Sequence, residues 1–73
     1  MMLSVLLSAN DLAHELNVSL RHVRRLDSSG KLPQPLRIGR CVRWSRETIT
    51  SWVAAGCPDR DTWEAMKNST DLN

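Results

Sequence analysis

Arginine and lysine side chains are concentrated in the middle of this chain. Eight of its ten basic residues lie between positions 21 and 46, and Asp27 is the only acidic residue within that span, so the local charge is near +7 while the formal net charge is +2. A guanidinium group can form bidentate hydrogen bonds with phosphates and with the O6 and N7 atoms of guanine. These residue types at this density indicate a nucleic-acid contact surface.

Catalytic and metal-binding chemistry finds little support elsewhere in the sequence. Cys41 and Cys57 are too few and too widely spaced for a zinc finger or ribbon. Neither cysteine forms a close ligand pair with His14 or His22. The chain also shows no paired acid and base, no glycine-rich phosphate loop and no credible set of nucleophilic residues. We therefore expect no enzyme activity, no metal and no cofactor.

Chain length and the N-terminal residues limit the number of domains and the cellular compartment that we expect. A chain of 73 residues has room for one small domain. Its first seven residues lack the basic start of a secretory signal, and their apolar run is too short to span a membrane. We expect a cytoplasmic protein without membrane contact, in a reducing compartment that keeps both thiols free.

A pair of short helices is predicted around the first basic residues. Ser8 and Asp11 have the spacing of a capping box, which predicts a helix over about 9–16. A second helix, over about 20–28, begins after Ser19, another residue suited to the N-cap. Only about three residues connect the two helices, so the pattern predicts a helix-turn-helix pair.

The second helix separates an apolar face from a cationic face. Leu20, Val23 and Leu26 recur at helical spacing and form its inner face. The outward residues are Arg21, His22, Arg24, Arg25 and Ser28. A solvated helix face usually mixes charges of both signs, whereas this helix carries one acid, which favours a binding role. For His22, contact with DNA and a place beside the core next to Leu26 are equally open.

An extended connection and a β-hairpin follow the second helix. Pro33 and Pro35 cannot continue a helix, because proline lacks the backbone donor and restrains the preceding residue. Alternating residues then predict two strands joined at Gly39-Arg40. The predicted inner face holds Leu36, Ile38, Val42 and Trp44, and the predicted outer face holds Arg37, Arg40 and Arg43.

Two more helices complete the predicted domain. Ser45 caps a helix over about 46–55 that ends before Gly56. The side chains expected to point inward are Ile49, Trp52 and Val53 from this helix, and Trp63 and Met66 from a last one over about 60–67. We expect one domain over 1–73, with a core over about 6–56, a short helix within 57–67 and a flexible tail over 68–73.

Several short segments, in order, carry a family resemblance. They are Leu7-Ser8-Ala9-Asn10-Asp11-Leu12-Ala13, Leu16-Asn17-Val18-Ser19, Val23-Arg24-Arg25-Leu26, Gly30-Lys31-Leu32-Pro33, Arg37-Ile38-Gly39-Arg40 and Val42-Arg43-Trp44. Together they resemble the MerR-like winged helix-turn-helix domains of phage excisionases and AlpA-type prophage regulators. The resemblance implies a recognition helix at about 20–28 and a wing at about 36–44. It also implies control of a promoter, or DNA bending that directs recombination, often by several copies on adjacent sites.

The predicted fold is therefore mostly α with a small β-hairpin wing, a winged helix-turn-helix. We expect the helix over 20–28 to enter the major groove and the wing to lie on the backbone or in the minor groove. The predicted DNA contacts are Ser19, Arg21, His22, Arg24, Arg25, Ser28, Lys31, Arg37, Arg40 and Arg43. Expected partners are double-stranded DNA and a second copy of the chain or a recombinase or transcription partner. The alternative is a protein-interaction adaptor whose basic face binds an acidic partner.

Overall fold

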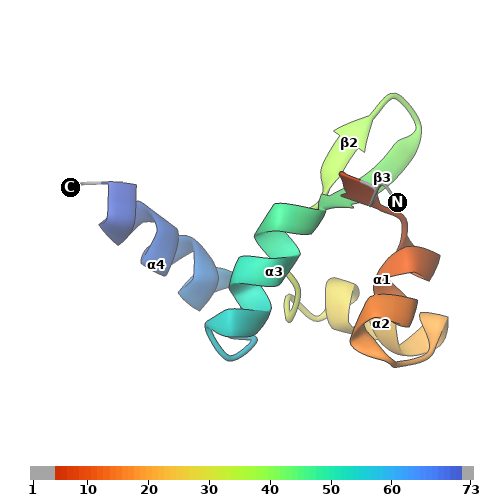
Figure 1. Ribbon diagram of the computed structural model, residues 1–73, viewed down its shortest axis with the longest axis horizontal. Coiled ribbons are helices and arrows are strands. Elements are labelled where there is room, and N and C mark those ends of the chain that lie inside the picture. The colour runs from red at the N-terminus through yellow and green to blue at the C-terminus, as the bar shows by residue number, and fades with distance from the viewer. Residues whose placement is uncertain (1–4, 72–73) are drawn as a thin grey trace.

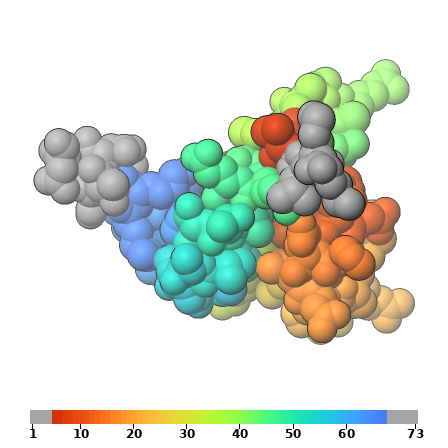
Figure 2. All heavy atoms as spheres, in the orientation of Figure 1, coloured from red at the N-terminus to blue at the C-terminus, as the bar shows by residue number. Residues whose placement is uncertain are grey.

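The computed structural model describes the backbone of residues 5–71 and the side chains of residues 5–67. Within this part, the elements in chain order are β1 (Leu6–Leu7), α1 (Ala9–Leu16), α2 (Leu20–Ser28), β2 (Leu36–Ile38), β3 (Cys41–Ser45), α3 (Arg46–Ala54) and α4 (Arg60–Asp71) (Figure 1). The predicted winged helix-turn-helix fold is confirmed. In the space-filling view the wing and α4 project from different sides of the body (Figure 2).

The helix-turn-helix pair forms as its capping residues predict. Ser8 and Asp11 bond reciprocally at the start of α1, each through a side-chain oxygen that accepts from the other residue's backbone N–H at 3.1 Å. Asn17 ends α1 in the left-handed conformation, with a φ of 58°, which asparagine tolerates better than most residues. Ser19 then caps α2, its hydroxyl oxygen accepting from the backbone N–H of His22 at 3.0 Å.

The sheet has three antiparallel strands in the order β1-β3-β2. The sequence predicted the hairpin of β2 and β3 but not β1, which is two residues long and pairs Leu6 with Ser45 and Leu7 with Trp44. So short a strand shows no alternation of its own, and only pairing with a distant partner defines it. The pairing places β3 in the centre of the sheet and brings the start of α1 beside it.

The register of the hairpin corrects the predicted division of its faces. Leu36 lies opposite Arg43, Arg37 opposite Val42 and Ile38 opposite Cys41. Directly opposed residues of antiparallel strands share a face. Arg37 therefore lies on the same face as Val42 and Trp44, whereas Arg43 lies on the face of Leu36 and Ile38. The predicted all-cationic outer face is wrong.

A two-residue turn is the reason for this register. Gly39 has a φ of 61°, whereas the φ of Arg40 is not positive. This combination is that of a type II′ turn. Because Ile38 pairs with Cys41 across that turn, even-numbered residues of β2 share a face with odd-numbered residues of β3. The prediction had placed the even-numbered residues of both strands on one face. Leu36 and Ile38 consequently remain 48% and 51% exposed.

One apolar core joins the helices to the sheet. Its buried members are Leu7, Leu12, Ala13, Val23, Leu32, Trp44, Ile49, Trp52 and Trp63. Two of the indole groups are also fixed by hydrogen bonds, since Trp44 Nε1 donates to the main-chain oxygen of Pro33 at 2.9 Å and Trp52 Nε1 donates to that of Pro58 at 2.7 Å. Val53 was expected to point inward with this group, but it is 46% exposed on α3.

The last helix is longer than predicted. Asp59 precedes α4, and one of its carboxylate oxygens accepts from the backbone N–H of Thr62 at 2.9 Å. The helix continues to Asp71 rather than ending near residue 67, because it contains no glycine or proline to stop it. Trp63 packs into the core as predicted, whereas Met66 is 42% exposed. The prediction of a flexible tail over 68–73 concerns residues whose side chains, and for 72–73 the backbone, lie outside the described part.

Candidate nucleic-acid interface

The exposed face of α2 carries three arginine side chains. Val23 is fully buried, and Leu20 and Leu26 are partly buried, so these three residues fix the orientation of the helix on the body. The residues on the other side, all exposed, are Arg21, His22, Arg24, Arg25 and Ser28. Within the described residues, no salt bridge involves an arginine of this face. The guanidinium groups are thus presented to solvent from a helix that its inner face anchors.

The serine hydroxyl groups at the two ends of α2 form hydrogen bonds within the helix. The Ser19 hydroxyl oxygen accepts at the N-cap, as the sequence predicted. The Ser28 hydroxyl donates to the main-chain oxygen of Arg25 at 3.1 Å, which leaves its oxygen lone pairs facing outward. Lys31 follows after the turn at Gly30, with its backbone N–H bonded to the oxygen of Leu26 at 2.8 Å and its side chain exposed.

The wing holds its arginines in three different environments. Arg40 lies exposed in the turn at the tip. Arg37 is exposed on the edge strand β2. Arg43 is only partly exposed on the central strand, and its Nη1 donates to the main-chain oxygen of Val42 at 2.9 Å. The predicted wing residues are therefore not equivalent, and Arg43 is the most enclosed of them.

A polar hollow of about 310 Å³ joins the end of α2 to the wing. It is lined by Asp27, Gln34, Pro35, Arg37 and Arg60. Arg60 Nη2 lies 2.9 Å from Asp27 Oδ1, so the one acid of α2 is paired with the first residue of α4. The hollow places Arg37 of the wing near the end of α2.

Sequence reasoning missed the role of Arg60. It placed this residue at the start of the last predicted helix, over about 60–67, and assigned it no contact with the helix over 20–28. The only signal in the sequence was that Asp27 is the single acid of an otherwise basic helix. The partner lies 33 positions further along the chain, a separation at which charge patterning alone identifies no contact.

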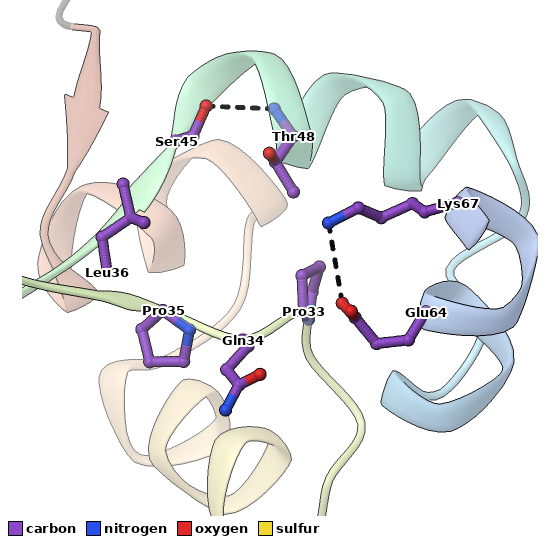
Figure 3. Close-up of a pocket in the computed structure, with 8 residues that line it drawn as sticks. All are labelled: Pro33, Gln34, Pro35, Leu36, Ser45, Thr48, Glu64 and Lys67. Atoms are coloured by element: carbon purple, nitrogen blue, oxygen red, sulfur yellow. Dashed lines mark hydrogen bonds and ion pairs between the residues drawn. The ribbon is translucent and has the colours of Figure 1, made fainter. Parts of the chain in front are cut away.

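A second hollow, of about 270 Å³, adjoins the first but lacks its cations (Figure 3). It is lined by Pro33, Gln34, Pro35 and Leu36 from the connection and β2, Ser45 and Thr48 at the start of α3, and Glu64 and Lys67 from α4. Lys67 Nζ points toward Glu64 Oε2 at 3.6 Å, within the same helix. No arginine lines this hollow, so we do not include it in the interface.

Arg46, the last residue of the basic run, forms a salt bridge with Glu15 of α1. Nearby, hydrogen bonds with the backbone and then the hydroxyl of Ser8 lower the pKa of Asp11, with smaller contributions from Arg43 and Arg46. This carboxylate thus stays charged under conditions that protonate an ordinary aspartate. The electrostatic role of Arg43 and Arg46 is at least partly internal to the protein.

Metal-binding and membrane-spanning features are absent from the described part of the chain. Its His, Cys, Asp and Glu side chains form no group of three or more that could hold a metal ion. No helix between residues 5 and 71 combines the length and the apolar character needed to cross a membrane.

Comparison with known proteins identifies the family. No curated protein and no solved structure gives a significant match to this chain. A family model described as a helix-turn-helix domain matches residues 6–57, which extend from β1 to just beyond α3 and leave α4 outside. Such domains are typically non-enzymatic and bind DNA. The match covers well over half of the 73 residues, and the chain therefore belongs to the helix-turn-helix domain family of DNA-binding proteins.

Proposed function

We propose that this protein binds specific DNA sequences, with α2 in the major groove and the wing on the backbone or in the adjacent minor groove. In this role it serves as a transcriptional regulator or as an excisionase-like recombination directionality factor. The observation that carries the proposal is the face of α2, where exposed arginines stand opposite a fully buried Val23. A helix of this kind meets the two needs of major-groove recognition, a fixed inner face and long donors on the outer face.

On α2 we assign base-edge contacts to the arginines and backbone contacts to the residues at its ends. Arg21, Arg24 and Arg25 have the fork geometry that reads guanine O6 and N7. Ser19, His22, Ser28 and Lys31 are assigned to phosphate or sugar contacts. His22 is exposed, which favours DNA contact over the place beside the core that the sequence left open.

On the wing we assign backbone contacts mainly to Arg37 and Arg40. Both side chains are exposed, and Arg37 shares a hollow with the end of α2, so a duplex held by α2 passes near it. Arg43 stays in the proposed set as the weakest member, because it is partly enclosed and bonded to Val42. Contacts of this kind add affinity that depends on salt but carries little sequence information.

Two copies on repeated sites fit the small size of the domain. A single module of this kind buries less surface than most sequence-specific complexes do. Of the two large apolar side chains of α4, Trp63 belongs to the core. The exposed Met66 is therefore our candidate for a contact between copies.

Selection of bound duplexes from a randomised pool, at near-physiological salt, tests the proposal. We expect enrichment of a motif by the wild-type protein, and weaker enrichment with a relaxed preference at one position in Arg24→Ala. Lys67→Ala is the matched control, since it also removes one cation but from a helix outside the proposed interface. Retention of duplexes without any motif would reduce the function to non-specific binding. Retention of no duplex at all would overturn the proposal in favour of the adaptor role.

Salt dependence supplies a second test with the same protein. For four to six phosphate contacts, the slope of log K against log salt concentration is expected to be about −4 to −5. A flat response would contradict a DNA interface made from exposed arginines.

A further inference from the structure

Arg60 contacts the end of α2 and the connection that follows it. Its Nε donates to the main-chain oxygen of Leu32 at 2.9 Å, and its backbone N–H donates to that of Gly30 at 2.9 Å. Its Nη2 donates to Asp27 Oδ1 at 2.9 Å and, over 3.4 Å, to the main-chain oxygen of Asp27. One residue thus holds the chain at three positions between α2 and the wing.

The connection held by Arg60 decides how α2 and the wing lie relative to each other. Leu32 and Pro33 are fully buried, and the main-chain oxygen of Pro33 accepts from the indole of Trp44 on β3. The connection is therefore fixed to the wing side by Trp44 and to the α2 side by Arg60. A duplex that contacts both α2 and the wing is sensitive to this arrangement, because misplaced contacts cannot form together.

Charge gives Arg60 a second effect at the same place. Asp27 is the only acid of α2 and lies in its last turn, where the helix dipole disfavours a negative charge. It also lines the hollow that Arg37 shares, so an unpaired carboxylate there would repel a phosphate close to the wing. The guanidinium of Arg60, with 27% of its side chain exposed, neutralises this carboxylate from the side of the protein.

We propose that Arg60 is a positioning residue for DNA recognition, which fixes α2 relative to the wing and neutralises Asp27 without contacting the DNA. The proposal rests on the proposed function. It extends the functional surface to α4, beyond residues 6–57 that match the family. It also gives the last helix a role in binding other than packing Trp63 into the core.

The test measures affinity for the selected duplex with Arg60→Gln, in the wild-type background and with Asp27→Asn. We expect Arg60→Gln to weaken binding about tenfold, and only about threefold when Asp27→Asn has removed the charge that needs neutralising. The slope of affinity against salt concentration is expected to stay unchanged, because no phosphate contact is lost. Arg60→Lys keeps the charge but not the forked hydrogen bonds, so it should recover only part of the affinity. Lys67→Gln, an equal change of charge on the same helix, should bind as wild type.

Three results would overturn the inference. An equal loss in both backgrounds, with the salt slope reduced by about one, would show that Arg60 contacts a phosphate directly. Unchanged affinity of Arg60→Gln, at a temperature where circular dichroism shows it folded, would show a role in stability alone. If the wild-type protein bound no duplex, the proposed function would fail and this inference with it, whereas the first two results leave the proposed function intact.

Discussion

The helix α2 and the wing both carry exposed arginines, but the protein supports them very differently. In α2 the cations occupy one face of a nine-residue helix whose opposite face includes the fully buried Val23. In the wing only three residue pairs join β2 to β3, and the cations are divided between the two faces and the tip. A firmly supported array suits contacts to base edges, which need fixed geometry, while a thin hairpin suits contacts to the backbone.

A buried residue between the two regions makes them depend on each other. Leu32 lies in the connection from α2 to β2 and is fully buried against the core. The two regions therefore share one apolar anchor although their surfaces differ. Substitution of this shared anchor should affect both regions, whereas substitution of an exposed arginine should affect only the region that carries it.

The largest expected effect comes from Leu32→Ala. Removal of this fully buried side chain should lower the free energy of unfolding by about 2–5 kcal/mol. Denaturant unfolding of a 73-residue domain measures this change. Ile38→Ala on the exposed face of the wing is the control and should change the free energy by less than about 0.5 kcal/mol. Similar losses in both variants would mean that the wing is anchored as firmly as the connection.

The next largest effect distinguishes the two regions by the part of the DNA that each contacts. Arg24→Ala should weaken binding to the selected sequence by about 1–3 kcal/mol and should relax the preference at one position of the motif. Arg40→Ala at the tip of the wing should instead weaken binding to all sequences alike and reduce the salt slope by about one. Titration of selected and scrambled duplexes with both variants measures the difference. A loss of sequence preference in Arg40→Ala would show that the wing, too, reads bases.

The corrected faces of the hairpin predict a smaller difference within the wing. Arg37→Ala should weaken DNA binding by about 1 kcal/mol at 0.1 M salt, as loss of one phosphate contact would. Arg43→Ala should leave affinity nearly unchanged, because Arg43 lies on the other face and bonds to Val42. Anisotropy titrations of the two variants, which have equal net charge, make the comparison direct. Equal losses would show that side chains from both faces of the hairpin contact the DNA.

The helix-turn-helix could be predicted because local signals determine it. The N-caps at Ser8 and Ser19, the left-handed Asn17 and the apolar spacing within α2 each involve residues a few positions apart. Such signals leave the bounds of α1 and α2 almost fully specified by the sequence. The exposed cationic face of α2 follows from the same spacing, which is why the best-predicted part of the candidate site lies on this helix.

The wing and the end of α2 depend on contacts that local patterns do not encode. The strand β1 exists only through its pairing with β3, and the Asp27–Arg60 pair spans 33 positions. For the hairpin, apolar and basic residues alternate, but the two-residue turn at Gly39-Arg40 sets which of them share a face. A pattern read strand by strand therefore assigned the residues of β2 to the wrong face.

The smallest expected effect concerns a wing arginine that acts within the protein, unlike those of α2. Hydrogen bonds with Ser8, aided by Arg43 and Arg46, lower the pKa of Asp11 from its ordinary 3.8, so the folded state favours the charged form. The resulting stabilisation is present above the ordinary pKa and is lost as the pH falls through the lowered one. Thermal unfolding over a pH series should show wild type more stable than Asp11→Asn near neutrality, with the difference shrinking in acid. Arg43→Ala should weaken this pH dependence without abolishing it, since the larger cause, the Ser8 hydrogen bonds, remains. A pH dependence that vanished in Arg43→Ala would instead make the wing arginine the main support of the α1 cap.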